Sequence, residues 1–433
     1  MIIHTVQLGD TVPSIARQYG VPVARIELDN NLPPNYILNV GQAIMIAPPE
    51  ATYIVKDGDT LSSITEANAT TPLQLIRDNP QLSEETSLSP GEELVLSYSR
   101  KKNIQVLGYT TSFITEPILR KTLPYLTYVA IMNYRVNSTG TVSDIDDARI
   151  IKMAYEYGVV PVMFVSAMTQ TGAGSYATTH AVLNNLDIQY QLIENILLIM
   201  EAKGFHGLDL AFYSILEEDL PAYVNFVTIV TERFNREGYE VFVTLTPQTM
   251  RYQAGVPYDK PYYEAFGRAA NKVILITYLW QHASINLVSQ TTVGFLKTKL
   301  DFVTTQIPPE KIFIAVNTVA YDWELPYIES EPIGSSLTNA GALSLANQLG
   351  SNIEFDEVTQ TPYFYYNALG IDHFVWFEDS RTVNALLNLV DEYGLAGIAI
   401  WNILYYYSQI WLSINSQYSI VTYDISSGEE QGT

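Results

Sequence analysis

Residues 204–213 read GFHGLDLAFY, and this stretch decides how the whole chain is interpreted. In a β-strand successive side chains point to opposite faces, so residues two apart share a face. One face of this stretch carries a carboxylate, a methyl and a phenol, from Asp209, Ala211 and Tyr213. The other face is wholly apolar, with Leu208, Leu210 and Phe212. The apolar face suits the layer between a parallel barrel and its helices, so the first face is expected to point into the barrel.

Seven further apolar, β-branched runs support a barrel: residues 104–109, 128–134, 159–165, 241–246, 273–278, 312–317 and 397–401. Helical stretches separate most of these runs. Together with residues 207–213, eight such strands predict an α/β fold, a (β/α)8 TIM barrel, whose active site lies at the carboxyl ends of the strands. The alternative is an open doubly wound sheet, but no glycine-rich phosphate loop supports it.

The opening stretch resembles the fourth-strand motif of glycoside hydrolase family 18, the chitinase-like family, which reads D-G-x-D-x-D-x-E. The resemblance implies cleavage beside an N-acetyl sugar with the acetamide of the substrate as nucleophile, an exception to the two-carboxylate scheme. The last Glu of the motif is the general acid, and the Asp two residues before it positions the acetamide. The four acidic positions of the motif are occupied here by His206, Asp209, Ala211 and Tyr213.

Only one of the four acids therefore remains. Ala211 has no polar group, and a tyrosine has an ordinary pKa of about 10, far from the near-neutral pKa that a general acid needs. We therefore predict no catalytic residue, and a barrel that holds a glycan without cutting it. The alternative is a relocated acid, Glu217 or Glu218, although both residues also suit the acidic first turn of the next helix.

The resemblance extends along the barrel. Residues 276–278 match the strand-six M-T-Y-D motif, with Tyr278 kept and Leu279 in place of the Asp that helps to bind the sugar. Residues 318–390 resemble the small α+β insertion after strand seven that forms one wall of the groove. Trp401 matches the tryptophan at the floor of the −1 subsite.

Aromatic side chains at predicted strand ends are candidates for stacking on sugar rings. The sequence has 31 tyrosines and 5 tryptophans, and most of them are expected to pack helices on the barrel. The candidates for ligand binding in the barrel are Asp209 and the aromatic residues Tyr109, Tyr134, Tyr213, Tyr278, Trp323 and Trp401.

An internal repeat precedes the barrel. Gly9-Asp10-Thr11 recurs as Gly58-Asp59-Thr60, and Asp29-Asn30 recurs as Asp78-Asn79. Each copy reads as strand, tight turn, helix, loop, helix, loop and strand. In each copy the Asp or the Thr after the glycine stands where a helix N-cap belongs.

The two copies resemble LysM modules, small βααβ units over residues 2–48 and 52–98. The resemblance implies binding of N-acetylglucosamine-containing glycans, either peptidoglycan or chitin, in a groove between the first turn and the loop after the second helix. That groove would involve Gly9, Asp10, Thr11 and Asn30 in the first copy, and Gly58, Asp59, Thr60 and Asn79 in the second. The alternative is that the glycine, aspartate and threonine only build the turn and the cap.

Composition excludes several classes of function. A net charge of −23 and a pI near 4.5 argue against nucleic acid and anionic membrane surfaces. The chain has no cysteine, and its five histidines lack zinc-ligand spacing, so we expect no metal and no cofactor. No apolar run reaches the length of a membrane span, and no secretory signal is visible.

The barrel is expected over residues 103–424, and residues 425–433 are expected to be a disordered tail. As a whole, the chain resembles the spore cortex-lytic N-acetylglucosaminidases, which implies a place in the spore coat, cortex or cell envelope. Three functions are compatible with the sequence. They are non-catalytic binding of a glycan, an active N-acetylglucosaminidase with a relocated acid, and a structural role in a spore surface layer or appendage, with spore-envelope proteins as partners.

Overall fold

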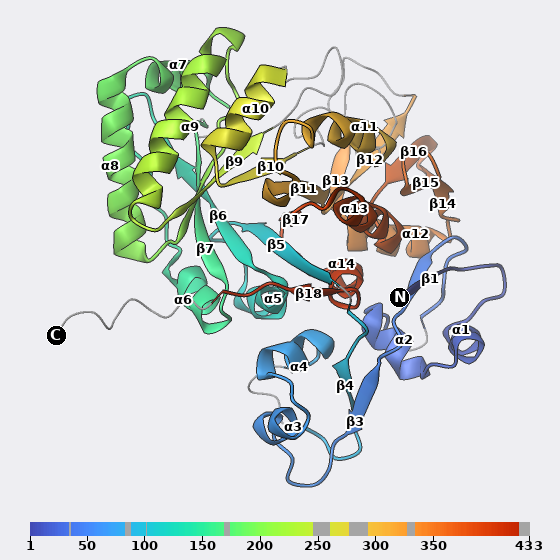
Figure 1. The fold of residues 1–433 in the computed structure, drawn as a ribbon. Coiled ribbons are helices and arrows are strands. Elements are labelled where there is room, and N and C mark those ends of the chain that lie inside the picture. Colours follow the sequence, from blue (N-terminus) through green and yellow to red (C-terminus); the bar gives the residue numbers. More distant parts are fainter. Residues whose placement is uncertain are drawn as a thin grey trace.

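Eight parallel strands close into a barrel (Figure 1). The structure, a computed structural model, describes residues 1–33, 36–82, 88–100, 102–168, 174–245, 260–276, 293–326 and 334–423. In chain order the barrel strands are β5 (Lys102–Thr110), β6 (Tyr128–Arg135), β7 (Val160–Ser166), β8 (Gly207–Leu210), β9 (Glu240–Leu245), β10 (Lys272–Leu275), β11 (Ile312–Asn317) and β17 (Gly397–Trp401). Each pairs with the next, and β17 pairs with β5. The predicted TIM barrel is confirmed.

Alternation along the strands separates two apolar layers. Leu208, Leu210 and Phe212 lie in the outer layer, which the helices cover, whereas Ala211 belongs to the layer inside the barrel and Tyr213 packs against it. This is the division that the period of two predicts. Burial of each large apolar side chain contributes about 1.5–3 kcal/mol, so the outer layer holds the helices on the barrel.

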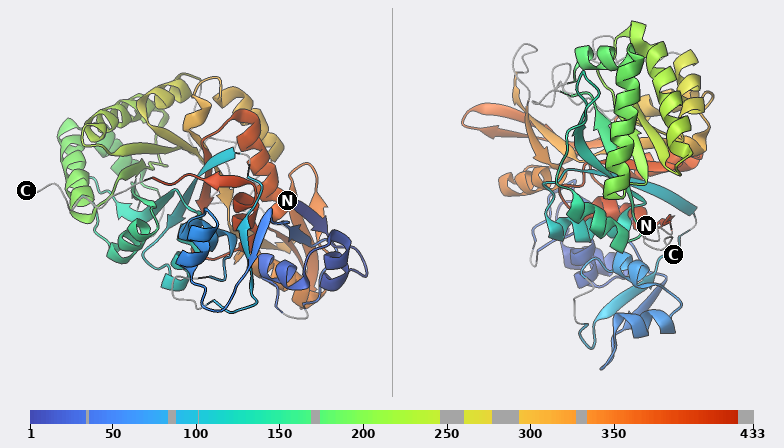
Figure 2. Two further views of the ribbon diagram at one scale, coloured as in Figure 1. Left: turned by 60° about the horizontal axis from the view of Figure 1, so that its bottom comes forward. Right: turned by 90° about the vertical axis from the view of Figure 1, so that its left-hand side faces the viewer.

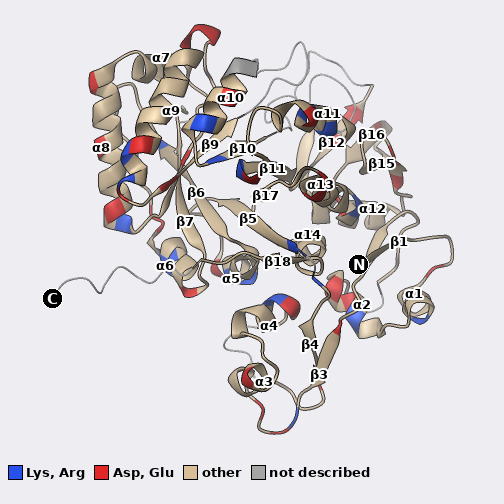
Figure 3. Ribbon diagram, in the orientation of Figure 1, with Lys and Arg blue, Asp and Glu red and all other residues tan. Residues whose placement is uncertain are grey.

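Helices surround the barrel (Figures 1 and 2). They are α5 (Glu116–Thr122), α6 (Ala148–Glu156), α7 (Tyr176–Leu183), α8 (Leu186–Lys203), α9 (Leu220–Asn235), α10 (Lys260–Ala269), α11 (Val293–Val303), α13 (Ser380–Tyr393) and α14 (Ser408–Asn415). Short 3-10 turns are η1 (Leu123–Tyr125), η2 (Glu217–Asp219) and η3 (Pro309–Lys311), and β18 (Tyr418–Ile420) pairs with the start of β5. Charged residues lie mainly on helices and loops rather than on the barrel strands (Figure 3).

The longest of these helices illustrates how the sequence sets its ends. The side chain of Asn185 accepts hydrogen bonds from the amides of Asp187 and Ile188 at the start of α8. Gly204, with φ of 80°, ends the helix in the left-handed conformation that favours glycine. The turn at Gly204 leads directly into β8.

The expected insertion lies between β11 and β17. Its five antiparallel strands follow the order β13, β12, β16, β15, β14. They are β12 (Val319–Leu325), β13 (Ser335–Thr338), β14 (Glu354–Asp356), β15 (Thr361–Ala368) and β16 (Ile371–Trp376). Helix α12 (Asn339–Leu349) joins β13 to β14, and its Ala342 and Ala346 pack with Ala320, Phe364 and Val375 of the sheet. The expected α+β character is confirmed.

The repeats fold as two similar βααβ modules. Module 1 contains β1 (Ile2–Thr5), α1 (Val12–Tyr19), α2 (Val23–Asp29) and β2 (Ala43–Ile46). Module 2 contains β3 (Ala51–Ile54), α3 (Leu61–Ala67), α4 (Pro72–Asp78) and β4 (Glu93–Ser97). The N-caps are the threonines rather than the aspartates, since Thr11 and Thr60 each form a capping box with a serine three residues later.

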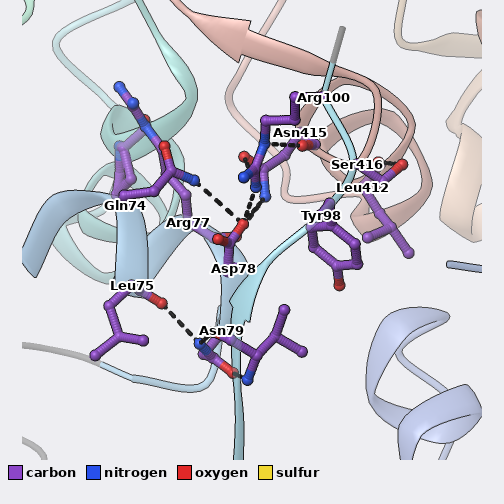
Figure 4. A network of polar contacts seen from close by, with 12 residues as sticks. Gln74, Leu75, Arg77, Asp78, Asn79, Tyr98, Arg100, Leu412, Asn415 and Ser416 are labelled. Carbon is purple, nitrogen blue, oxygen red and sulfur yellow. Dashed lines mark hydrogen bonds and ion pairs between the residues drawn. The ribbon is translucent and has the colours of Figure 1, made fainter. Parts of the chain in front are cut away.

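A buried polar network joins module 2 to the barrel (Figure 4). Asp78 forms an ion pair with Arg100 and accepts a 2.8 Å hydrogen bond from the amide of Asn415 on α14. The backbone carbonyl of Arg77 accepts hydrogen bonds of 3.0 Å from the hydroxyl of Tyr125 and from Asn415, and the guanidinium of Arg77 donates to the carbonyl of Pro124. These contacts place module 2 against η1 and α14.

Module 1 contacts the insertion as well as α14, where the side chain of Gln409 donates a 3.1 Å hydrogen bond to the carbonyl of Ala43. The amide of Ile353 donates a 2.8 Å hydrogen bond to the carbonyl of Val40. Gly41 lies so close that a β-carbon added there would sit 1.7 Å from the carbonyl oxygen of Ile353. Its φ of 85° also favours glycine, so this contact requires glycine for two independent reasons. The expected disordered tail, residues 425–433, lies outside the described residues.

Candidate functional site

A single carboxylate lies inside the barrel on β8. Asp209 is completely buried, and it accepts a 2.9 Å hydrogen bond from the hydroxyl of Tyr109 on β5. The hydroxyl of Thr244 on β9 lies 2.7 and 2.9 Å from its two oxygens. Burial raises the pKa of Asp209 to about 6, while the hydrogen bonds from Thr244 and Tyr109 oppose that rise. Side chains from β5 and β9 thus meet the carboxyl group of β8 inside the barrel.

The two motif positions that have lost their acids, Ala211 and Tyr213, lie just beyond the end of β8. Strand β8 ends at Leu210, three residues before the predicted end, although the amide of Ala211 still donates a 3.0 Å hydrogen bond to Val165. The methyl of Ala211 is completely buried among apolar side chains inside the barrel. Tyr213 is half-buried, and its ring centroid lies 6.4 Å from that of Phe164. No carboxylate stands at either position.

Aromatic rings surround this carboxylate. The ring of Trp401 lies 4.5 Å from that of Tyr109 and 6.0 Å from that of Phe164, between centroids. Tyr109 is completely buried and Trp401 is 7% exposed. Burial of its phenol, followed by the nearby charge of Asp209, raises the pKa of Tyr109 well above its ordinary value. Trp401 therefore lies beside Tyr109 and Phe164 inside the barrel, and its place at the floor of a sugar site stays a prediction.

Tyr134 is not part of this group, which corrects one expectation. Its hydroxyl donates a 2.5 Å hydrogen bond to Asp147 and accepts one of 2.9 Å from Lys203, and its ring lies in the outer layer. The register of β6 against β7 shifts between Ile131 and Tyr134, and Asn133 has a φ of 85°. This irregularity breaks the alternation on which the expectation rested.

The other aromatic candidates have different outcomes. Trp323 is 3% exposed, and its ring centroid lies 5.6 Å from that of Tyr321 and 6.0 Å from that of Trp376 in the insertion sheet. Its ring is thus committed to a stack of neighbouring aromatic rings, and sugar binding by it stays a prediction. Tyr278, with Leu279 beside it, lies outside the described residues.

The alternative acids lie in η2 and at the start of α9. Glu217 and Glu218 are exposed. Asp219 is buried and contacts Nδ1 of His180 at 2.9 Å and the side-chain amide of Asn184 at 2.7 Å. The three acids lie in the separate 3-10 turn η2 directly before α9, rather than in the first turn of the helix itself as expected.

His206 occupies the first acidic position of the motif. It precedes β8 at the amino end of the strand, opposite to the carboxyl ends. Its ring packs edge-on against Tyr155 at 5.8 Å, and burial lowers its pKa. The histidine therefore does not lie beside Asp209.

In the modules, the two predicted asparagines act as internal braces. The side-chain amide of Asn79 donates to the carbonyls of Leu75 and Val95, at 2.9 and 2.7 Å, and its oxygen accepts a 2.8 Å bond from the amide of Val95. Asn30 makes the same three bonds to Ile26 and Met45. Both side chains are buried, so they hold helix to strand, and contact with a ligand stays a prediction.

The two aspartates build the tight turns. Asp10 accepts a 2.7 Å bond from the amide of Gln7 and contacts His4, and the Gln7 bond is the main reason why the pKa of Asp10 is lowered. Asp59 accepts from the amide of Lys56 and from the hydroxyl of Tyr53. Gly9 and Gly58 have φ of 92° and 82°. This is the turn-and-cap role that the sequence left open, and binding by these residues stays a prediction.

Thr244 is the partner that the sequence did not reveal. Thr244 carries the single hydroxyl in the apolar run 241–245, at a position that faces into the barrel. A lone hydroxyl in an apolar run is the signal by which the sequence could have revealed it. Among the described residues no group of three or more acidic or histidine side chains is placed to hold a metal ion. None of the described helices is both long and apolar enough to span a membrane.

Comparisons with known proteins cover nearly the whole chain. The family model described as glycosyl hydrolases family 18 matches residues 105–405, and the LysM domain model matches residues 4–47 and 53–97. The cortical fragment-lytic enzyme of Bacillus anthracis is 31% identical over 96% of this chain and 98% of that protein. The enzyme of the same name from Bacillus subtilis is 29% identical over 97% of this chain and 99% of that protein.

Solved structures agree with this result. The crystal structure of the Bacillus cereus spore cortex-lytic enzyme SleL superposes with a TM-score of 0.81 at 30% identity, covering 97% of this chain and 98% of that one. A chitinase from Chromobacterium violaceum superposes with a TM-score of 0.65 at 22% identity over 72% of this chain and 98% of that one, which shows the shared fold.

Proposed function

The chain belongs to glycosyl hydrolase family 18 and carries two LysM domains, and from this premise we propose that it binds the N-acetylglucosamine-containing glycan of the spore cortex without cleaving it. The LysM domains and the family fold support a carbohydrate ligand. The spore cortex as location rests on relatives that are named cortical fragment-lytic or spore cortex-lytic enzymes. The absence of cleavage rests on the residues of the fourth strand.

The observation that carries the proposal is the pair Ala211 and Tyr213. A general acid must lie within hydrogen-bond reach of the oxygen it protonates and needs a pKa near the working pH. A methyl group cannot orient an acetamide, and the phenol of Tyr213 is a hydrogen-bond donor rather than an acid at neutral pH. Asp209 is already bound by Tyr109 and Thr244. The phenol and the aromatic floor remain suitable for binding a sugar.

Hydrolysis of cortex fragments is the second candidate, and a specific observation favours it. Relatives that align over nearly their whole length are named as lytic enzymes, and those names support hydrolysis better than they support binding alone. This candidate requires an acid at another position. The exposed Glu217 and Glu218 are the carboxylates closest in sequence to the motif.

One experiment separates the two candidates. The purified chain is incubated with soluble cortex fragments and with N-acetylglucosamine oligomers, while calorimetry measures binding and mass spectrometry measures products. If the chain binds without cleaving, calorimetry detects binding of the glycan and no new reducing ends are formed. Cleavage that disappears in only one of Glu217→Gln and Glu218→Gln would establish the second candidate instead. A structural role in a spore surface layer stays a separate prediction, which sedimentation of the protein without glycan tests.

A further inference from the structure

A cavity of about 600 Å³ lies between module 2 and the barrel, outside the mouth of the barrel. We call it the interdomain cleft. One wall is the loop after α4, with Pro80, Gln81 and Leu82, and the opposite wall includes Arg120 and Lys121 of α5 together with Tyr157. The volume falls in the range of ligand-binding pockets, about 300–1,000 Å³. The loop wall belongs to the part of module 2 where the LysM resemblance expects glycan, whereas the barrel wall is an addition.

The two walls of the cleft are fixed relative to each other. Tyr125 lines the cleft and donates a hydrogen bond to the carbonyl of Arg77, which directly precedes the loop wall. Asn415 braces the same carbonyl and also Asp78 (Figure 4). Because these contacts are buried, a ligand meets a cleft that is already formed, and little ordering has to accompany binding.

The barrel wall carries two cationic side chains, Arg120 and Lys121, beside one carboxylate, Glu116, in a strongly acidic chain. The ammonium of Lys121 lies 4.2 Å from the ring centroid of Tyr406, and within the described residues no carboxylate forms an ion pair with it. Arg120 is paired with Glu116 at 2.9 Å, and both of these side chains are substantially exposed. Against a net charge of −23, an ammonium in a preformed cleft that pairs with none of the described carboxylates favours an anionic ligand.

We propose that the interdomain cleft is a second glycan site, which takes a carboxylate-bearing segment of peptidoglycan with its carboxylate at Lys121 and Arg120 and its uncharged part along Pro80 and Gln81. This inference rests on the proposed function, because it extends the glycan held by module 2 onto the barrel. A site of this kind would also discriminate between glycans. Peptidoglycan carries carboxylates on its stem peptides, and on those lactyl groups that bear no peptide, whereas a polymer of N-acetylglucosamine alone carries none.

Calorimetry on the full chain tests the site with three probes. These are a peptidoglycan tetrasaccharide with its stem peptides, the same fragment after amidase removal of the peptides, which leaves the lactyl carboxylates, and an N-acetylglucosamine hexamer. Lys121→Gln removes the charge and keeps a polar side chain that is one atom shorter. It is expected to weaken binding of at least one carboxylate-bearing probe about tenfold and to leave the hexamer within twofold. The probe that loses affinity identifies which carboxylate is recognised.

Two further variants, each with a matched control, locate the site. Gln81→Trp fills the cleft and is expected to weaken the same carboxylate-bearing probe, whereas Gln191→Trp on the exposed face of α8 adds the same bulk elsewhere and should change nothing. Arg120→Gln is expected to weaken the same probe, and Arg268→Gln is its control, since Arg268 forms the same exposed i,i+4 pair with a glutamate on α10. Unchanged binding in folded Lys121→Gln and Gln81→Trp overturns the inference and leaves the proposed function intact. Equal weakening of all three probes by Lys121→Gln overturns the carboxylate assignment, and no binding of any probe by the unchanged chain overturns both proposals.

Discussion

The hydroxyl of Tyr109 donates a 2.9 Å hydrogen bond to the buried carboxylate of Asp209. The acid that the fourth strand keeps is therefore held by the protein itself, with Thr244 as the second donor. Because the partners come from β5 and β9 on either side of the barrel interior, Asp209 joins three strands. We infer that this carboxylate has a structural role. That role predicts that the stability of the fold depends on pH.

Asp209→Asn is expected to flatten the dependence of stability on pH. The pKa of Asp209 is raised from its ordinary 3.8 to about 6, so between these values the folded chain binds more protons than the unfolded chain. The free energy of unfolding therefore falls as pH rises from about 4 to 6, by up to about 3 kcal/mol. Urea unfolding at several pH values measures this slope, which should be shallower in the variant. Parallel slopes for both proteins would contradict the raised pKa.

Restoring the two acids should restore catalysis. The double variant Ala211→Asp, Tyr213→Glu supplies both the acetamide-positioning group and the general acid, and we expect release of reducing ends to rise about 10²-fold or more. Ala211→Asn, Tyr213→Gln is the matched control, since it has nearly the same shape without an ionisable group. Equal rates in the two double variants would show that the missing acids are not what limits the barrel.

Asn79→Ala should destabilise module 2. The change removes three hydrogen bonds and leaves the buried backbone of Val95 unsatisfied, which costs about 3 kcal/mol. Asn30→Ala should cost a similar amount in module 1, because the bonds to Met45 repeat the arrangement. Asn68→Ala, which removes one bond to Ile64, is the milder control. Hydrogen exchange resolves the modules separately, and normal protection of β4 in Asn79→Ala would count against the brace.

Arg100→Met should loosen module 2 from the barrel. It leaves Asp78 buried without its ion-pair partner, and such changes cost about 3–5 kcal/mol. The double variant with Asp78→Asn should recover part of this loss, because the uncompensated charge is gone. Limited proteolysis of the segment after β4 reports the coupling. Cleavage of Arg100→Met at the unchanged rate would exclude a role of the ion pair in docking.

The barrel could be predicted because its signals are local. The eight apolar runs and the alternation in residues 207–213 depend only on neighbouring positions along the chain, and all eight strands are present. Tyr134 could not be placed in this way, because one register shift in β6 reverses the face of every later residue.

Contacts between segments that are distant along the chain could not be predicted from the sequence. Arg100 reads as part of a short basic, polar linker, yet its guanidinium is buried against Asp78 and Asn415. Thr244 shows the same limitation inside the barrel, since its pairing with Asp209 depends on which strands become neighbours. The asparagines of the modules were assigned to a groove from resemblance alone, whereas their hydrogen bonds are directed inward.

The backbone hydrogen bond from Ile353 to Val40 joins module 1 to the insertion, and the absence of a side chain at Gly41 allows the close approach. If the glycan of the proposed function contacts both module 1 and the insertion, this contact keeps the two binding places at a constant separation. A single polymer bound at both places would have to span that separation. Affinity would therefore depend on the length of the sugar chain. Short oligomers would reach only one of the two places, and longer ones would gain from both.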